Sequence, residues 1–341
     1  MEQNGNVYIQ DLKSKDAGYG KPIKVNNTLY YIKLKMPSML DHVQIWLIKD
    51  FDKWVLVDTG LNRHEHKEVV SEIIDNFCGG KLSKVIVTHF HVDHIGLAGW
   101  ICEKYNVELN ITEAEWLTAM VSFLDIKSNF FNEYLDLLKH LGIRESDIIL
   151  LKNSFKWYNI YPLPRKIKVV QEGEHLEING ENWKSIICQG HSPAQLCLFN
   201  QNQNLLICGD HLMSHLVPVL GFLIYKPETD LLGGYLRSFE KLQFLNANTL
   251  VLPAHGDPFF DPINRMQELS LIFNDELNSL LKRLNTPQTL GELVAYECPD
   301  RTNPFRLRFY IEKYLALTNY LIKNKQVRKI SQENTHLFQK V

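Results

Sequence analysis

The run His-Phe-His-Val-Asp-His at positions 89–94 constrains this chain more than any other feature. It follows Val85 to Val87, an apolar segment that predicts a short buried strand. In an extended segment, residues two apart point to the same side, so His89 and His91 should face one way, while Asp93 and His94 turn to another side as a helix begins. Burying these groups together without a partner would destabilise the fold, so the run predicts metal ligands.

Three later segments repeat this arrangement of a ligand-type residue after a short apolar strand. His191 follows a strand predicted at Trp183 to Cys188, Asp210 follows Leu205 to Cys208, and His255 follows Leu250 to Leu252. A rigid sheet would hold each side chain at a strand end. Any one of these would be weak evidence, but together with the first run they indicate a single site for two adjacent metal ions.

These motifs resemble the metallo-β-lactamase superfamily, whose H-x-H-x-D-H signature is matched by His89, His91, Asp93 and His94. The superfamily also has an Asp-x-Gly turn after a strand, found here as Asp58-Thr59-Gly60, and the likeness covers about Leu29 to Pro258. It implies an α/β fold, the αββα sandwich. One departure is His191-Ser192-Pro193-Ala194-Gln195, where many relatives have His-Thr-Pro-Gly-His, and it weakens the analogy with the glyoxalase II type.

The resemblance also implies how the ligands are shared. His89, His91 and His191 would bind the first metal, and Asp93, His94 and His255 the second, with Asp210 bridging both. Asp58 would be a hydrogen-bond partner of a ligand. Zinc suits these nitrogen and carboxylate donors best, and iron or manganese remain alternatives because no Cys is a ligand. Two such metals would activate a bridging hydroxide, with Asp93 or Asp210 as the catalytic proton shuttle.

The composition of the chain limits which binding partners and which cellular location we expect. The 37 Lys and Arg against 39 Asp and Glu give no reason to expect a polyanionic partner for the whole chain. Met1 to Gln10 has no signal-peptide pattern, and Leu216 to Tyr225, among the most apolar stretches, falls well short of the ~20 residues that cross a bilayer. Six cysteines without a C-x-x-C pair indicate reduced thiols. We therefore expect a cytoplasmic protein without a membrane partner, and the oligomeric state stays open.

From about Pro262 the pattern changes from strands to helices, so we predict a catalytic domain over residues 1–261 and a small helical domain over 262–341. The latter resembles the winged-helix-like appendage of some superfamily members. The segment from Lys282 to Lys329 contains ten Lys or Arg and four Asp or Glu. This excess is compatible with RNA contact, but a solvated basic helix face explains it more simply.

An insertion over residues 113–165 interrupts the catalytic domain and is rich in aromatic side chains. We expect it to pack helices onto the core and to form a helical lid over the metals. The aromatic residues are Trp116, Phe123, Phe130, Phe131, Tyr134, Trp157, Tyr158 and Tyr161. The apolar segment Leu216 to Tyr225 could line the same pocket, which would suit an acyl chain.

The sequence thus predicts a metal-dependent hydrolase that uses a metal-bridging hydroxide on a small-molecule ester, thioester or lactone. One alternative is a phosphodiesterase or ribonuclease that acts on RNA, favoured by the basic C-terminal region. Another is a metal-binding regulator without turnover, which the full ligand set argues against. An antibiotic-degrading lactamase is disfavoured, because such enzymes usually carry an export signal and a Cys ligand.

Overall fold

The computed structural model describes residues 19–37, 40–124, 129–154, 159–223, 225–332 and 335–341, without the side chains of 124 and 129–131. The predictions for residues 1–10 and for the side chains of Phe130, Phe131, Trp157 and Tyr158 therefore lie outside the described residues.

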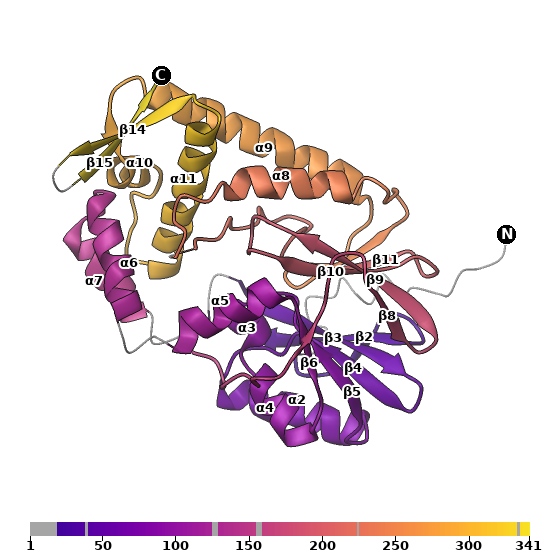
Figure 1. Cartoon of the computed structure of the whole chain (residues 1–341). Coiled ribbons are helices and arrows are strands. Elements are labelled where there is room, and N and C mark those ends of the chain that lie inside the picture. Colours follow the sequence, from indigo (N-terminus) through magenta and orange to yellow (C-terminus); the bar gives the residue numbers. More distant parts are fainter. Residues whose placement is uncertain (1–18, 38–39, 125–128, 155–158, 224, 333–334) are drawn as a thin grey trace.

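Two sheets stack face to face and carry the fold (Figure 1). The first has its strands in chain order, antiparallel from β1 to β4 and parallel from β4 to β7. Its strands are β1 (Ile23–Lys24), β2 (Leu29–Lys35), β3 (His42–Asp50), β4 (Lys53–Val57), β5 (Leu82–Ile86), β6 (Leu109–Ile111) and β7 (Lys168–Val169). The second sheet has the order β12-β11-β10-β9-β8. Its strands are β8 (His175–Ile178), β9 (Glu181–Cys188), β10 (Gln195–Asn200), β11 (Leu205–Gly209) and β12 (Leu250–Pro253).

The strand sequences explain the stacking, because apolar residues occupy both faces of the central strands. In β3, Ile45 and Leu47 belong to a core on the outer face of the first sheet, whereas Trp46 belongs to the core between the sheets. Trp183 of β9 and Leu198 of β10 enter that same inner core from the second sheet. A strand buried on both faces requires a layer on each side, and alternation of side chains supplies it.

Helices form the two outer layers. The first sheet is covered by the helical segments between His64 and Tyr105, and the second by α8 and α9 (Figure 1). The bounds are α2 (His64–Glu72), a π-helical turn (Ile73–Phe77), α3 (Val92–Ile95), α4 (Ala98–Tyr105), α8 (Leu231–Lys241) and α9 (Pro262–Arg283). The predicted αββα sandwich is confirmed.

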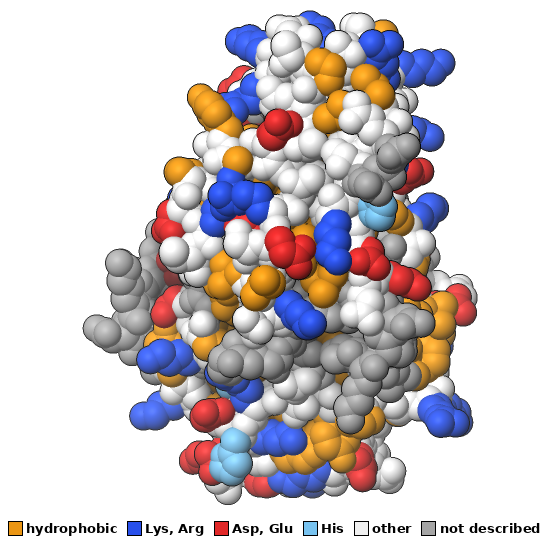
Figure 2. All heavy atoms as spheres, turned by 90° about the vertical axis from the view of Figure 1, so that its left-hand side faces the viewer, with side chains coloured by type: hydrophobic (Ala, Val, Ile, Leu, Met, Phe, Trp, Pro, Cys, Tyr) orange, Lys and Arg blue, Asp and Glu red, His pale blue; other side chains and the backbone are white. Residues whose placement is uncertain are grey.

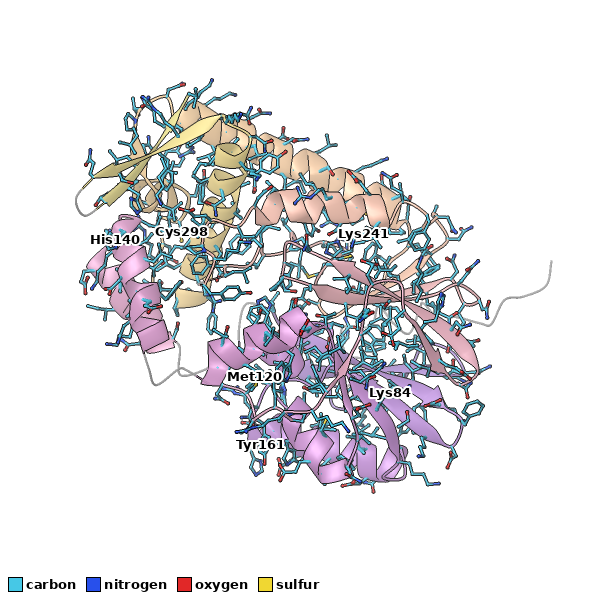
Figure 3. The ribbon with its side chains drawn as sticks, viewed as in Figure 1. Lys84, Met120, His140, Tyr161, Lys241 and Cys298 are labelled. Atoms are coloured by element: carbon cyan, nitrogen blue, oxygen red, sulfur yellow. The ribbon has the colours of Figure 1, made fainter. Side chains whose placement is uncertain are left out.

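The insertion divides into two parts. Helix α5 (Glu113–Leu124) packs on the core of the first sheet through Ala119 and Trp116. Helices α6 (Asn129–His140) and α7 (Glu145–Ser154) instead share a core with the C-terminal elements (Figure 1). The ring of His140, at the end of α6, lies 6.0 Å from the ring of His336 in β15. Met120, in α5, lies near the first sheet instead (Figure 3). Helix α6 also contacts the segment 216–225, since the ring of Tyr134 lies 5.6 Å from that of Phe222. The lid role of the insertion stays a prediction.

The C-terminal elements build a small unit around α11, together with a three-stranded sheet of order β13-β15-β14. They are β13 (Gln288–Thr289), α10 (Leu290–Glu297), α11 (Pro304–Lys323), β14 (Val327–Gln332) and β15 (Thr335–Lys340). The buried carboxylate of Asp147 on α7 accepts hydrogen bonds from Arg144 at 3.1 Å and from Arg301 at 2.6 Å. This ion pair joins the insertion to the C-terminal unit. None of the helices that the structure describes is both long and apolar enough to span a bilayer.

Several elements differ from their sequence predictions. The helical pattern from Glu113 to Leu141 predicts one long stretch, but the structure has separate helices α5 and α6. Helices α7 and α8 and strands β8 and β15 were not predicted. The pair Gly233-Gly234 lies inside α8 and is untypical of a helix, so the sequence did not predict this element. The side chain of Asp230 caps the helix by accepting a hydrogen bond from the Gly233 N–H.

Candidate metal centre

The His89–His94 run makes the predicted transition from extended chain to helix. His91 is extended, with φ −61° and ψ 147°, and is the N-cap of α3. Asp93 and His94 lie in the first turn of that helix. Because the backbone changes conformation here, the side chains of His89 and His91 join one group of potential ligands, and those of Asp93 and His94 join another.

Two groups of potential ligands result, one of His89, His91, His191 and Asp210, the other of Asp93, His94 and His255. Within each group the donor atoms lie within 4.8 Å of one another. In the first group, His89 Nε2 is 3.0 Å from His91 Nδ1 and 3.1 Å from His191 Nε2. Three ring nitrogens thus converge on one point, which is the arrangement of a metal ligand set.

Asp210 connects the two groups. Its Oδ2 lies 3.4 Å from His191 Nε2 and 3.4 Å from His255 Nε2, and its Oδ1 lies 3.4 Å from His94 Nε2. In the second group, Asp93 Oδ2 lies 3.3 Å from His255 Nε2. All seven residues that the sequence predicted as ligands therefore lie in one cluster, and Asp210 lies between the two groups.

The outer nitrogens of four imidazoles are anchored by oxygen acceptors. His191 Nδ1 lies 2.7 Å from the Val219 carbonyl, and His255 Nδ1 lies 2.7 Å from the His42 carbonyl. His94 Nδ1 lies 2.8 Å from Asp58, and His89 Nδ1 lies 3.0 Å from Thr88 Oγ1. A nitrogen that donates outward leaves the other ring nitrogen as a lone-pair donor, so these contacts fix the tautomer needed for metal binding.

The cluster fits divalent metal ions. Three buried carboxylates, Asp58, Asp93 and Asp210, lie among the imidazoles, and within the described ranges no Lys or Arg forms an ion pair with them. His94 Nε2, His255 Nε2 and Asp210 Oδ1 are buried without a hydrogen bond from any described residue. Buried polar atoms without a partner and buried negative charges destabilise a fold. Cations at the two points of convergence would bind the unpaired atoms and neutralise the carboxylates. Burial also holds the pKa of His89 and His91 well below the usual range, which keeps their rings neutral for coordination.

Asp58 is a hydrogen-bond partner rather than a ligand, as predicted. Its carboxylate accepts from the Thr88 N–H at 2.8 Å, from the Thr88 hydroxyl at 2.8 Å and from His94 Nδ1 at 2.8 Å. The backbone of Asp58 is left-handed, with φ 62°. One buried carboxylate therefore orients His94 directly and His89 through Thr88.

The loop that carries His191 depends on a glycine. Gly190 has φ +114°, and a Cβ there would lie 2.3 Å from Tyr235 Cβ on α8. Only glycine allows both the conformation and the close approach. Helix α8 thereby supports a ligand loop, a role that the sequence pattern did not indicate.

Glu115 is a site residue that sequence reasoning missed. It lies in the first turn of α5, has 0% exposure, and accepts hydrogen bonds from the loops that carry His89, His91 and His191. Burial raises its pKa to about 7, against the lowering effect of those hydrogen bonds. The only sequence signal was an acidic residue in a helical first turn, which is common and unspecific.

The two extra histidines near Asp210 are not part of the cluster. His211, which directly follows Asp210, has 0% exposure and packs against the ring of Tyr235, with the centroids 4.8 Å apart. His215 is exposed. His66 lies outside the ligand motifs, and its Nδ1 accepts from the Leu61 N–H at 2.9 Å, which supports the turn after Asp58.

The chain matches the family model of the metallo-beta-lactamase superfamily over residues 39–255. It belongs to this superfamily. The match covers the complete ligand cluster, from the strand before Asp58 to His255. The resemblance inferred from the motifs is thus confirmed, and a divalent-metal hydrolase scaffold is established for the chain.

Individual superfamily members show how far the likeness extends. The chain is 25% identical over 240 residues to the probable metallo-hydrolase YqjP of Bacillus subtilis, covering 67% of this chain and 71% of that protein. It is 25% identical over 176 residues to the hydroxyacylglutathione hydrolase GloC of Haemophilus influenzae, covering 51% of this chain and 69% of that one. A beta-lactamase domain protein from Burkholderia ambifaria has the same fold, with a TM-score of 0.84 and 23% identity over 96% of this chain and 97% of the other. The last comparison extends the shared fold to the C-terminal unit.

Proposed function

We propose that this chain is a dinuclear metal-dependent hydrolase acting on a small-molecule ester, thioester or lactone. The observation that carries the proposal is the convergence of seven donor residues on two points, with the outer ring nitrogens of four histidines anchored. His89, His91 and His191 would hold one ion, Asp93, His94 and His255 the other, and Asp210 both. Zinc is the preferred metal, with iron or manganese as alternatives.

When bound, the ions would supply Lewis acidity and lower the pKa of a water molecule between them. The protein residues provide geometry and proton transfer. Asp93 is among the more accessible ligands, with 11% of its side chain exposed, and His94 and His255 lower its pKa in spite of burial. An ionised carboxylate in the cluster can accept a proton from water and deliver it to a leaving group, so we assign that role to Asp93, with Asp210 as the second candidate.

Two observations favour an acyl substrate. A superfamily relative is named hydroxyacylglutathione hydrolase, and its substrate is by that name an acyl derivative of glutathione. In the present chain, the ring of Phe123 on α5 lies 6.4 Å from that of Phe90, within the ligand loop. Apolar side chains beside the metal ligands suit an acyl group better than a phosphate.

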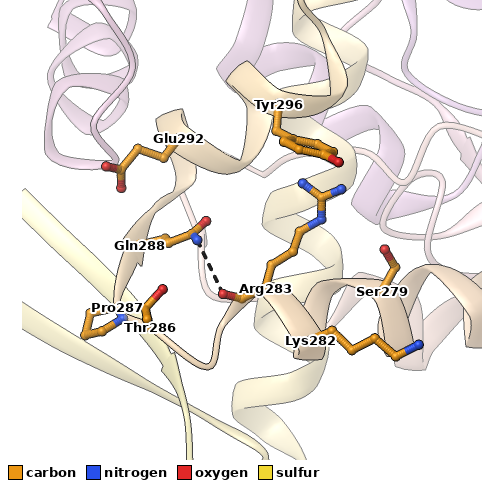
Figure 4. Close-up of a pocket in the computed structure, with 8 residues that line it drawn as sticks. All are labelled: Ser279, Lys282, Arg283, Thr286, Pro287, Gln288, Glu292 and Tyr296. Carbon is orange, nitrogen blue, oxygen red and sulfur yellow. Dashed lines mark hydrogen bonds between the residues drawn. The ribbon is translucent and has the colours of Figure 1, made fainter.

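RNA is a weaker candidate, because several basic side chains of the C-terminal unit pair with acidic side chains of the protein. Helix α11 is buried along much of its length, and its Lys313 pairs with Glu276 at 2.6 Å. In a pocket of this unit, the Arg283 guanidinium stacks on Tyr296 at 3.4 Å and pairs with Glu297 at 2.9 Å (Figure 4). Basic side chains are more frequent at the end of the molecule formed by these elements, but over the rest of that face they alternate with acidic ones (Figure 2). On the face shown in Figure 2, the described basic side chains therefore do not form the continuous positive track that favours RNA binding.

We keep residues 1–261 and 262–341 as the proposed catalytic and C-terminal domains, and a cytoplasmic location, which the six free buried cysteines support. The test is a hydrolysis panel of acyl thioesters, lactones, phosphodiesters and short RNA, with and without chelator, and with His89→Ala as control. We expect metal-dependent cleavage of an acyl substrate that the variant loses. RNA cleavage without acyl hydrolysis would reverse the ranking, and metal binding without any turnover would favour the regulator.

A further inference from the structure

Glu115 is hydrogen-bonded to both loops that carry the three histidines of the first site. Its Oε2 accepts from the Phe90 N–H at 2.9 Å. Its Oε1 accepts from the Ser192 hydroxyl at 2.6 Å and from the Ala194 N–H at 2.6 Å. The side chain is fully buried and uses both oxygens.

The partners of Glu115 come from two loops on different sheets. Phe90 lies between His89 and His91, in the loop after β5 of the first sheet. Ser192 and Ala194 follow His191, in the loop between β9 and β10 of the second sheet. Thr112, just before α5, adds a hydrogen bond from its hydroxyl to the Ala194 carbonyl at 2.9 Å. The start of α5 therefore fixes one loop relative to the other.

We propose that Glu115 is a positioning residue that sets the spacing between the His89–His91 pair and His191, and thereby the metal affinity of that three-histidine site. The inference rests on the proposed function, since it presumes that these histidines bind metal. It assigns no such role toward the second site, because the hydrogen-bond partners of Glu115 flank only the three histidines of the first site.

The substitution Glu115→Gln tests the hydrogen bonds of Glu115 without changing the packing volume, because the two side chains have nearly the same shape. An amide has one acceptor oxygen, while the site presents two backbone N–H groups and one hydroxyl. The Ser192 hydroxyl can rotate, but a backbone N–H cannot. In either orientation of the amide, its NH₂ faces the N–H of Phe90 or of Ala194, and that loop must shift. Loss of such a partner typically lowers metal affinity about 10–100-fold.

The experiment measures zinc affinity with a chromophoric chelator in two backgrounds of the full chain. His255→Ala leaves the three-histidine site intact, and His91→Ala leaves the second site intact. We expect Glu115→Gln to weaken zinc binding about tenfold or more in the first background and by less than about twofold in the second. Equal losses in both, or none in the first, would overturn the proposal.

Two further variants control for a purely structural effect. Glu312→Gln alters another buried glutamate, which pairs with Arg308 on α11, and should leave zinc affinity unchanged in both backgrounds. Ser192→Ala removes one donor without adding a repulsive contact, so it should produce a smaller loss confined to the first site, and it remains informative if Glu115→Gln does not fold. A wild-type chain that binds no zinc would refute the proposed function itself, whereas normal zinc binding that Glu115→Gln leaves intact would refute only the positioning role.

Discussion

Replacement of Asp58 by Asn tests whether the hydrogen bonds behind the ligands control the metal centre. Asp58 accepts three hydrogen bonds, two from Thr88 and one from His94 Nδ1. An Asn oxygen can still accept from Thr88, but its NH₂ then faces the Nδ1–H of His94. To avoid two opposed donors, His94 must move its proton to Nε2, the nitrogen that faces Asp210 at 3.4 Å. That tautomer cannot ligate a metal.

The expected loss of metal affinity is about 10–100-fold, or about 1.4–2.7 kcal/mol, the range found when such partners are removed. Competition with a chromophoric chelator measures it, and kcat/KM on the substrate found by the hydrolysis panel should fall with metal occupancy. Asp147→Asn is the matched control, because Asp147 is also buried and hydrogen-bonded but pairs with Arg144 and Arg301. It should lower thermal stability without changing metal affinity. Unaltered zinc binding in Asp58→Asn would refute the orienting role of this carboxylate.

Three further outcomes are expected. Removal of metal by a chelator should lower the melting temperature, since a ligand at 100 times its Kd stabilises the fold by about 2.7 kcal/mol per site; an unchanged melting curve would mean that no metal binds the folded state. Arg301→Ala removes a partner at 2.6 Å from the buried Asp147 and should cost about 3 kcal/mol in the free energy of unfolding, measured in urea, while zinc affinity stays the same; a loss below about 0.5 kcal/mol would indicate that Arg144 alone neutralises Asp147. At pH 8, Cys78 and Cys102 should resist a disulfide reagent in the native protein and react after denaturation, because burial raises the pKa of both thiols to about 12; fast reaction of the native thiols would contradict their burial.

The sequence predicted the residues that cluster at the candidate metal centre, because each belongs to a local pattern. A ligand-type side chain directly after an apolar strand is visible in the chain itself, as for Asp210 after β11 and His255 after β12. The sheet then brings the strand ends to one edge. Superfamily resemblance added the pairing of ligands, which spacing alone could not give.

What the sequence could not predict depends on contacts between distant segments. Glu115 is distinguished only by its hydrogen bonds to Phe90, Ser192 and Ala194, which lie 25 to 79 positions away. The packing of α6 and α7 on the C-terminal unit likewise depends on the ion pair of Asp147 with Arg301, 154 positions apart. Helix α8 was missed because Gly233 and Gly234 lower helix propensity, and tertiary packing of Tyr235 and Phe239 overrides that local preference.

The central claim is that the cluster binds two metal ions, and calorimetric titration of zinc into the metal-free chain tests it most directly. The account predicts two ions per chain, and one ion per chain for His91→Ala and for His255→Ala, which each lose a ligand of a different site. Absence of zinc binding by the wild-type chain, or binding that both variants retain at full stoichiometry, would contradict it.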